Sequence, residues 1–211
     1  DRYTPPLVTD VVEHAAAATY VTVFDAKALF HQFELDADSQ HLTTTQWHDG
    51  TFSQWTRAPF GLADILATAQ RFLDMHIVTA TCKVYVDDIV IGAATIEEAI
   101  DQNIELLERA AKLNLCLNVD KAQWITQHPV LLGFDVNCTN HTLTPHANRM
   151  TAMANYRRPT SNSGLRRFIS KGSYWGRFVP GWPAMQRRLS AFIDYNQPLK
   201  WSEERIATFF E

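Results

Sequence analysis

The stretch Cys82-Lys-Val-Tyr-Val-Asp-Asp-Ile-Val-Ile91 sets two adjacent acids, Asp87 and Asp88, between two runs of apolar, mostly β-branched residues. Such runs favour β-strands, and Gly92 closes the second of them. The sequence therefore predicts a tight hairpin with both carboxylates at its tip. A turn without Gly or Asn is conformationally costly, and backbone strain of this kind concentrates at functional sites.

Two carboxylates in an apolar hairpin are unfavourable unless a cation compensates their charge. Mg²⁺ prefers carboxylate oxygens and usually keeps several waters while it binds substrate phosphates. Asp25 ends the β-rich run Tyr20-Val-Thr-Val-Phe24 and is the natural third ligand. The three acids thus predict a two-metal site with ions roughly 3.5–4 Å apart. Adjacent acids are also common in ordinary surface loops, so the dipeptide alone does not separate these interpretations.

The segments around this hairpin alternate strand and helix signals up to about residue 140. The expected elements are a helix capped by Thr9 with Val11, Val12, Ala15 and Ala16 inward, a hairpin at Asp49-Gly50, a helix after Gly61, a helix from the capping box Thr95-Ile-Glu-Glu98 to about Asn114, and a strand over Leu131–Val136. Beyond Pro145 the pattern is helical, with an interruption near Pro159. These patterns predict an α+β domain followed by a mainly helical one.

Composition narrows the class of protein. With 211 residues and 46% hydrophobic content, the chain can bury a core in one or two units. No apolar stretch of about 18 residues is present, so a membrane span is not expected, and no signal peptide is visible. The three cysteines, Cys82, Cys116 and Cys138, suit reduced thiols in an intracellular compartment better than a disulfide framework or a zinc cluster.

Charge is distributed unevenly along the chain. Residues 1–140 carry 8 Lys and Arg against 19 Asp and Glu, a net charge of −11, whereas residues 141–200 carry 10 against 1, a net charge of +9. This asymmetry indicates an anionic partner for the C-terminal part, although an ordinary solvated basic face would give the same count.

Seven short boxes, spread over essentially the whole chain, follow a known order and spacing. They are Phe24-Asp25-Ala-Lys-Ala-Leu-Phe30-His31-Gln32, Arg57-Ala-Pro59-Phe60-Gly61-Leu62, Tyr85-Val86-Asp87-Asp88, Leu117-Asn-Val-Asp-Lys121, Leu131-Leu-Gly133-Phe134, the basic and aromatic segments from Arg158 to Pro180, and Trp201-Ser-Glu-Glu204. Together they resemble the reverse transcriptases of gypsy-type LTR retrotransposons, a Metaviridae-like pol family. One such box would be weak evidence, whereas seven in order are strong evidence.

The resemblance implies a right-hand polymerase fold. Residues 1–35 and 61–141 would form the palm, an antiparallel sheet packed on helices, and residues 36–60 partial fingers. Residues 142–198 would form a helical thumb, and residues 199–211 the start of a connection towards an RNase H domain. The family further implies fusion to RNase H and integrase in a longer polyprotein, no membrane association, and a location in a cytoplasmic virus-like particle or the nucleus.

The family's roles, carried across residue by residue, imply an RNA-directed DNA polymerase that extends a primer with dNTPs on an RNA or DNA template. Asp25, Asp87 and Asp88 would be catalytic and would hold two Mg²⁺ ions, for which Mn²⁺ could substitute. Nucleotide-binding roles fall on Phe30, as a steric gate against a 2′-hydroxyl, and on Phe60, Gly61 and Lys121. Primer and template contacts fall on Tyr85, Leu132, Gly133, Phe134, Arg166, Arg167, Lys171, Tyr174, Trp175 and Arg177.

Several positions depart from the family pattern and keep alternatives open. Leu29 replaces a small residue before the gate, where a branched side chain could crowd the 3′ side of the nucleotide; Ile65-Leu66, Ala69 and Ser170 replace Ala-Pro, Phe and Gly. A catalytically impaired nucleic-acid-binding scaffold derived from a reverse transcriptase is therefore an alternative. A viral RNA-dependent RNA polymerase is disfavoured by Phe30, because ribonucleotides need room for the 2′-hydroxyl. Phe30 could instead be an ordinary core aromatic residue, and Lys121 an ordinary surface lysine. Gln70 is expected to cap its helix and face solvent, without contacting substrate.

Overall fold

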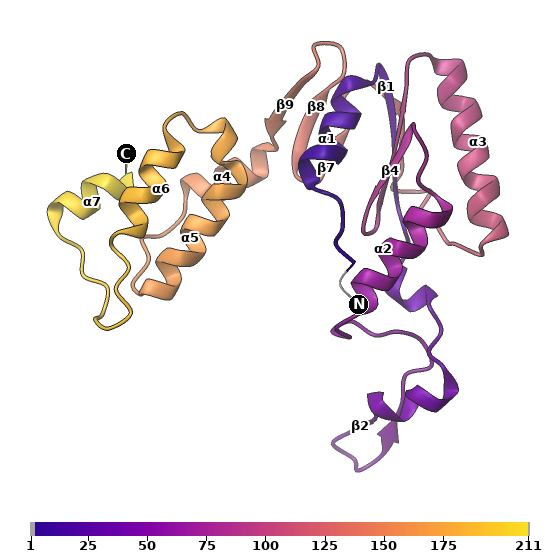
Figure 1. The fold of residues 1–211 in the computed structure, drawn as a ribbon, viewed down its shortest axis with the longest axis horizontal. Coiled ribbons are helices and arrows are strands. Elements are labelled where there is room, and N and C mark those ends of the chain that lie inside the picture. Colours follow the sequence, from indigo (N-terminus) through magenta and orange to yellow (C-terminus); the bar gives the residue numbers. More distant parts are fainter. Residues whose placement is uncertain (1–2, 211) are drawn as a thin grey trace. The chain divides into compact units, whose positions relative to one another are not determined.

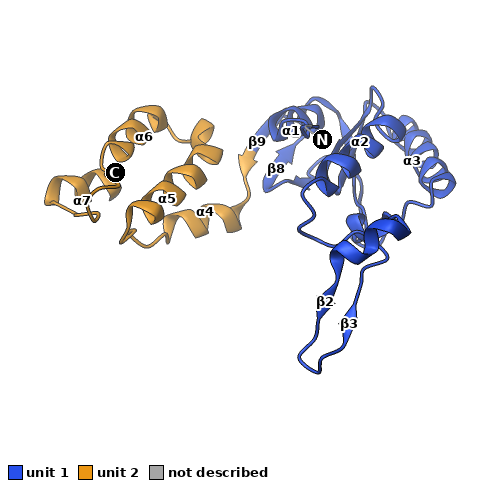
Figure 2. Cartoon of the chain, turned by 60° about the horizontal axis from the view of Figure 1, so that its bottom comes forward, with its two compact units in different colours: residues 1–143 blue, residues 144–211 orange. Residues whose placement is uncertain are grey.

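A computed structural model describes residues 3–210 of the chain. The chain divides into two compact units, residues 1–143 and residues 144–211 (Figure 2). The first unit mixes strands and helices and the second is mainly helical, so the predicted α+β domain followed by a helical one is confirmed. None of the helices in the described residues is long and apolar enough to cross a membrane.

The first unit is built on a four-stranded antiparallel sheet in the order β4-β5-β1-β6. Strands β1 and β4 of this sheet are labelled in Figure 1. The strands are β4 (Cys82–Tyr85), β5 (Asp88–Ala93), β1 (Tyr20–Asp25) and β6 (Gln123–Thr126). β1 and β5 pair without a shift from Tyr20↔Ala93 to Asp25↔Asp88. The central hairpin and the strand that ends on Asp25 are thus confirmed, and this register fixes where the acids lie. β6 escaped prediction because its four residues show no alternation of buried and exposed positions.

The two faces of this sheet are covered by different helices. Alternate residues point to opposite faces of a strand, and one face carries Phe24, Ile89 and Ile91, which are buried in the main core cluster. That face packs on α2 (Ile65–His76) and α3 (Ile96–Lys112). The other face carries Gly92, whose Cα approaches α1 (Val8–Ala17) so closely that an added Cβ would lie 3.0 Å from the Ala18 Cβ. Each fully buried large apolar side chain contributes about 1.5–3 kcal/mol to this arrangement.

The N-termini of α3 and α1 can be compared with the N-cap residues predicted from the sequence. In α3, the Thr95 hydroxyl oxygen accepts the Glu98 N–H (3.2 Å), which confirms Thr95 as the N-cap. The Glu98 carboxylate accepts the N–H of Ala94, one residue before the N-cap, so the capping box forms with its second hydrogen bond shifted by one residue. The predicted cap at Thr9 is wrong, because α1 begins at Val8 and its N-cap residue is Leu7, without a side-chain cap. The four residues expected to face inward from α1 are all buried.

The remaining strands form two smaller sheets, β2-β3 and β7-β8-β9. β2 (Thr45–Gln46) and β3 (Phe52–Ser53) form the hairpin predicted at Asp49-Gly50. The single strand predicted over residues 131–136 is wrong: β7 (Val130–Leu131) and β8 (Phe134–Asn137) are joined by a two-residue turn and continue into β9 (Thr142–Pro145). Both turn residues have positive φ, 52° at Leu132 and 85° at Gly133, as a type I′ hairpin requires.

The second unit contains α4 (Ala147–Ala154), α5 (Asn162–Trp175), the 3₁₀ turn η3 (Gly176–Phe178), α6 (Trp182–Ser190) and α7 (Glu203–Phe210). α4 and α5 are separated around Pro159, where the interruption was predicted. Leu165 and Leu189 are fully buried, and partly buried Trp201 and Phe209 pack against their cluster. Residues from 199 onward, interpreted from sequence as the start of a connection, therefore contribute to the core of this unit.

Candidate active site

The three predicted acids lie at one end of the central sheet. Asp25 ends β1 and Asp88 begins β5, and the two are direct partners across the antiparallel ladder. Directly opposite residues place their side chains on the same face, with Cβ atoms about 4.5–5.5 Å apart. Asp88 also pairs with Tyr85 on β4, so that only Val86 and Asp87 form the turn. The prediction that both acids form the tip is thus corrected for Asp88, which lies within the strand.

This arrangement concentrates negative charge. Burial, then the neighbouring carboxylates of Asp87 and Asp25, raise the pKa of Asp88 to about 6. Within residues 3–210, no cationic side chain forms an ion pair with any of the three acids. A divalent cation would supply the missing positive charge, and the all-oxygen donor set is the one that Mg²⁺ and Mn²⁺ prefer.

The side chains of Asp25, Asp87 and Asp88 do not form a ready-made three-ligand metal site. In the described part of the chain, no group of three His, Cys, Asp or Glu side chains is arranged as a metal site. Mg²⁺ commonly binds one or two carboxylates and completes its shell with water and substrate phosphates, so convergence of all three side chains is not required. The residues therefore fit a divalent metal whose coordination is completed by substrate.

Replacing Asp88 by Asn is expected to stabilise the metal-free chain at neutral pH. The pKa of Asp88 is raised from 3.8 to about 6, so the wild-type carboxyl favours folding while it is protonated. That contribution is fully present below pH 3.8 and is lost as the pH rises through about 6. Above pH 6, the variant should have a free energy of unfolding greater by on the order of 1–3 kcal/mol.

Urea unfolding in EDTA at pH 4 and pH 7.5 measures this difference. Asp101→Asn, at an exposed position of α3, is the matched control and should change little at either pH. A difference between Asp88→Asn and wild type that is the same at both pH values would contradict the assigned coupling.

The turn between β4 and β5 has a strained backbone, and a side chain of α2 forms hydrogen bonds with it. Val86 has φ 55°, a left-handed conformation that β-branched residues rarely adopt. The side chain of Gln70, which is fully buried, accepts the Val86 N–H (2.8 Å) and donates to the Val84 carbonyl (3.2 Å) and the Asp74 carboxylate (2.9 Å). The expectation that Gln70 is solvated was wrong, and its contacts make it a positioning residue for the acid-bearing turn.

Backbone hydrogen bonds tie two further segments to the acids. The Ala26 N–H donates to the Asp87 carbonyl (2.7 Å), and the Asn118 N–H donates to the Asp25 carbonyl (2.8 Å). Lys121 follows three residues later and is exposed. The structure therefore brings the segment of Lys121 beside the strand of Asp25, while the nucleotide-binding role of Lys121 stays a prediction.

Phe30 and Phe60 come together from different segments. Phe30 lies on the 3₁₀ turn η1 (Leu29–Gln32), and its ring meets that of Phe60 edge-on at 5.6 Å between centroids. Phe60 is 72% exposed, and Gly61 beside it has φ 94°, a conformation that favours glycine. Leu29 is buried in the core cluster, which argues against crowding of a nucleotide by its side chain.

The predicted primer-contacting residues of the first unit fall at two hairpins. Tyr85 is partly exposed and pairs with Asp88. Leu132 and Gly133 form the turn between β7 and β8, whereas the Phe134 side chain is 2% exposed and belongs to the interior. Contact between this segment and a primer would therefore involve the turn and not the ring of Phe134.

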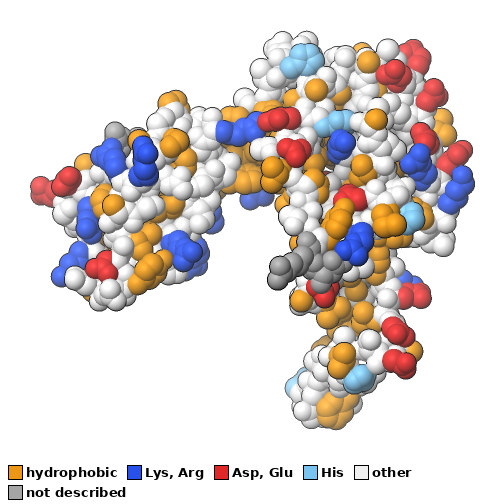
Figure 3. Space-filling view, in the orientation of Figure 1, with side chains coloured by type: hydrophobic (Ala, Val, Ile, Leu, Met, Phe, Trp, Pro, Cys, Tyr) orange, Lys and Arg blue, Asp and Glu red, His pale blue; other side chains and the backbone are white. Residues whose placement is uncertain are grey.

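The predicted primer and template residues of the second unit lie on α5 and η3. Arg166, Arg167, Lys171, Tyr174 and Arg177 are exposed, and Trp175 is buried. On the face in Figure 3, Lys and Arg side chains outnumber acids over this unit. The exposed set can meet an anionic surface, while Trp175 packs in the interior and meets the Tyr174 ring edge-on at 4.6 Å.

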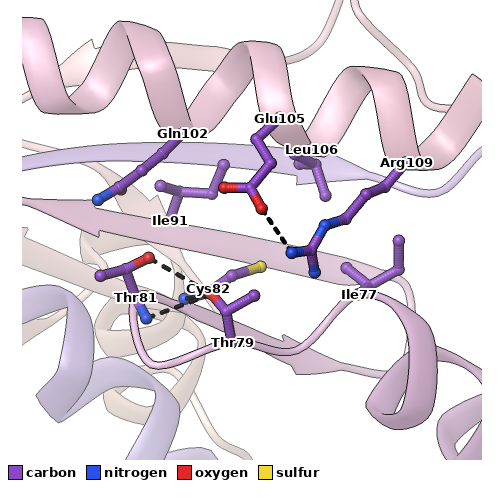
Figure 4. A pocket seen from close by; sticks show the side chains of 9 residues that line it. All are labelled: Ile77, Thr79, Thr81, Cys82, Ile91, Gln102, Glu105, Leu106 and Arg109. Atoms are coloured by element: carbon purple, nitrogen blue, oxygen red, sulfur yellow. Dashed lines mark hydrogen bonds and ion pairs between the residues drawn. The ribbon is translucent and has the colours of Figure 1, made fainter.

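A crevice between α3 and the β4–β5 hairpin is too small for a nucleotide or other substrate (Figure 4). Its volume is about 20 Å³, room for about one water. Burial raises the pKa of the Cys82 thiol to about 12, so the thiol stays protonated and is a poor nucleophile. Glu105 and Arg109 pair with each other at its rim.

Sequence comparison identifies relatives of this chain. A family model described as "Reverse transcriptase (RNA-dependent DNA polymerase)" matches residues 3–136. The chain is 25% identical over 207 residues to the retrovirus-related Pol polyprotein from transposon 412 of Drosophila melanogaster, covering 97% of the chain and 16% of that protein. It is also 25% identical over 210 residues to the enzymatic polyprotein of cauliflower mosaic virus (strain D/H), covering 97% of the chain and 30% of the polyprotein. The chain thus spans less than a third of these relatives.

Structural comparison gives the same fold. The foamy viral protease-reverse transcriptase bound to double-stranded DNA matches with a TM-score of 0.86 and 19% identity, over 99% of this chain and 37% of that one. The same viral protein bound to an RNA/DNA hybrid matches with a TM-score of 0.81 and 19% identity, over 99% of this chain and 28% of that one. At this identity the likeness establishes the fold.

Proposed function

The chain belongs to the reverse transcriptase family, and from that membership we propose that it is the palm and thumb part of an RNA-directed DNA polymerase that extends a primer with dNTPs. The observation that carries the proposal is the direct pairing of Asp25 with Asp88 across β1 and β5, with Asp87 in the adjoining turn. Its relatives are polyproteins, and we propose that this segment also functions within a longer chain that contains RNase H and integrase parts.

Members of this family generally use divalent metal ions, and we propose two Mg²⁺ ions here, with Mn²⁺ as a possible substitute. Asp25 and Asp87 would hold them and Asp88 would support them from β5. When bound, the ions supply a lowered pKa at the primer 3′-hydroxyl and positive charge at the leaving pyrophosphate. The chain's own part is to hold the carboxylates at one end of a rigid sheet and to keep their backbone fixed through Gln70, Ala26 and Asn118.

Substrate recognition is assigned to two surfaces, one near the acids in the first unit and one on the basic helices of the second unit. We propose that Phe30 and Phe60 face the incoming nucleotide, that Gly61 allows close backbone approach, and that Lys121 meets its phosphates. Exposed Arg166, Arg167, Lys171 and Arg177 would neutralise phosphates of the primer and template, a role favoured by the +9 charge of residues 141–200. The foamy viral neighbours are bound to duplex DNA and to an RNA/DNA hybrid, which supports a duplex as the partner.

Primer extension tests this function. With a labelled primer on RNA or DNA template, dNTPs and Mg²⁺ or Mn²⁺, the chain is expected to add template-directed nucleotides, and EDTA should stop the addition. The affinity for a duplex should fall steeply as salt is added. The logarithm of the association constant should decrease with the logarithm of the salt concentration, with a slope of about −0.9 for each phosphate contacted. Salt-sensitive binding without any extension would instead favour the catalytically impaired scaffold.

A further inference from the structure

The 3₁₀ turn that carries Phe30 begins with a strained residue. Ala28, directly before η1, has φ 48° and ψ 50°, the left-handed conformation that L-residues with a Cβ disfavour. Strained residues persist when surrounding contacts over-determine them. The contacts that hold this turn are therefore the ones that place the Phe30 ring.

Gln32 supplies three of these contacts with its side-chain amide, beside a backbone hydrogen bond from the Lys27 N–H to the Cys116 carbonyl (3.0 Å). Its Nε2 donates to the carbonyl of Lys27 (2.6 Å), the residue before Ala28, and to the carbonyl of Cys116 (3.0 Å). Its Oε1 accepts the Cys116 N–H (2.8 Å). The side chain thus pairs with both polar groups of the Cys116 backbone, and fastens both ends of the turn to a segment 84 residues away in sequence.

The opposite side of the turn is fastened to the segment that carries Phe60. His31 Nδ1 lies 3.0 Å from the Ala58 carbonyl, and the Arg57 guanidinium donates to the Gln32 carbonyl (3.0 Å). The Phe30 ring, in contact with Phe60, is thereby placed between two anchored segments. Asp25 is anchored separately through the Asn118 N–H, so loss of the Gln32 amide would leave the carboxylate strand in place.

We propose that Gln32 is a positioning residue for nucleotide selection: its amide holds η1 so that the Phe30 ring stands against the sugar of the incoming nucleotide. The proposal rests on the proposed polymerase function. Gln32 acts through Phe30 and touches no reacting atom, so its loss should affect nucleotide affinity and sugar discrimination more than the maximal rate.

Gln32→Met keeps the length of the side chain and removes its three hydrogen bonds. In steady-state primer extension, we expect the KM for dNTP to rise about tenfold and the preference for dNTP over rNTP to fall about tenfold, while kcat stays within about twofold. Gln32→Glu, which keeps the acceptor and sets a carboxylate against two carbonyls, should not rescue the wild-type preference. Gln54→Met is the matched control, because Gln54 is exposed and bonds only Thr44 Oγ1 among its side-chain contacts in the described residues.

Amide hydrogen exchange tests the hydrogen bonds of the Gln32 side chain to Lys27 and Cys116, here called the Gln32 clamp, and does not depend on polymerase activity. Exchange at Cys116 and residues 27–33 should rise in Gln32→Met and stay unchanged over α2. Unchanged exchange at Cys116 would overturn the clamp, and faster exchange with undiminished sugar preference would overturn the selective role. If the wild-type chain extends no primer, the proposed function fails and the selective role with it, whereas exchange still shows whether the clamp exists.

Discussion

Asp87→Asn is expected to reduce the rate of primer extension by about 10³-fold or more while leaving the fold intact. Asp87 is exposed in the turn, so an isosteric amide costs no core packing. Its carboxylate is one of the acids assigned to the metal ions, which supply several kcal/mol of transition-state charge stabilisation. At about 1.4 kcal/mol per tenfold in rate, losing a ligand accounts for the expected decrease.

Single-turnover extension at saturating dNTP measures this rate, and thermal unfolding of the same preparation shows that the fold is retained. Asp101→Asn removes an equal charge from an exposed position of α3 and should extend primers at the wild-type rate. Duplex binding should be preserved in both variants, because neither removes a basic residue. Wild-type extension by Asp87→Asn would refute the metal assignment, whatever the fold.

The hairpin and its acids could be predicted because local signals agreed with the tertiary structure. Apolar β-branched runs specified β4 and β5, and the strand ending on Asp25 had the same signature. Pairing of Asp25 with Asp88 could not be derived from either run alone, because register depends on contacts between segments more than 60 residues apart. The metal argument and the family resemblance grouped the three acids, but neither gave the register that makes Asp25 and Asp88 direct partners.

Errors arose where tertiary contacts overrode a local interpretation. Gln70 falls at helical spacing from buried Ala67 and Leu73, a signal that it faces inward, yet a polar side chain was expected to be solvated. Leu132-Gly133 is a turn inside a mostly apolar run. The local sequence does not predict that a leucine adopts a positive φ of 52° there. Leu29 lies beside the gate in sequence, but neighbouring residues of a turn point in different directions and its side chain enters the core.

The second large effect is expected in the helical unit, where Trp182 packs against two glycines of α5 and η3. A Cβ added to Gly172 would lie 2.1 Å from Trp182 Cη2, and one added to Gly176 would lie 2.2 Å from Trp182 Cδ1. Trp182 is 7% exposed, so its ring cannot turn away without opening the core. Gly172 and Gly176 are four positions apart and so share one side of the helical segment, where they leave room for the indole.

Gly172→Ala is therefore expected to lower the free energy of unfolding by about 2 kcal/mol or more. Helix propensity alone predicts the opposite, a gain of about 1 kcal/mol for Ala over Gly, and the steric overlap should outweigh it. Urea unfolding decides between them, with Ser170→Ala on the exposed side of α5 as the control that should show only the small propensity effect. In a Trp182→Leu background the added methyl group has space, so Gly172→Ala should cost far less there. A stabilised Gly172→Ala chain would mean that the indole moves freely, and the close packing assigned to the Trp182 contact would then be wrong.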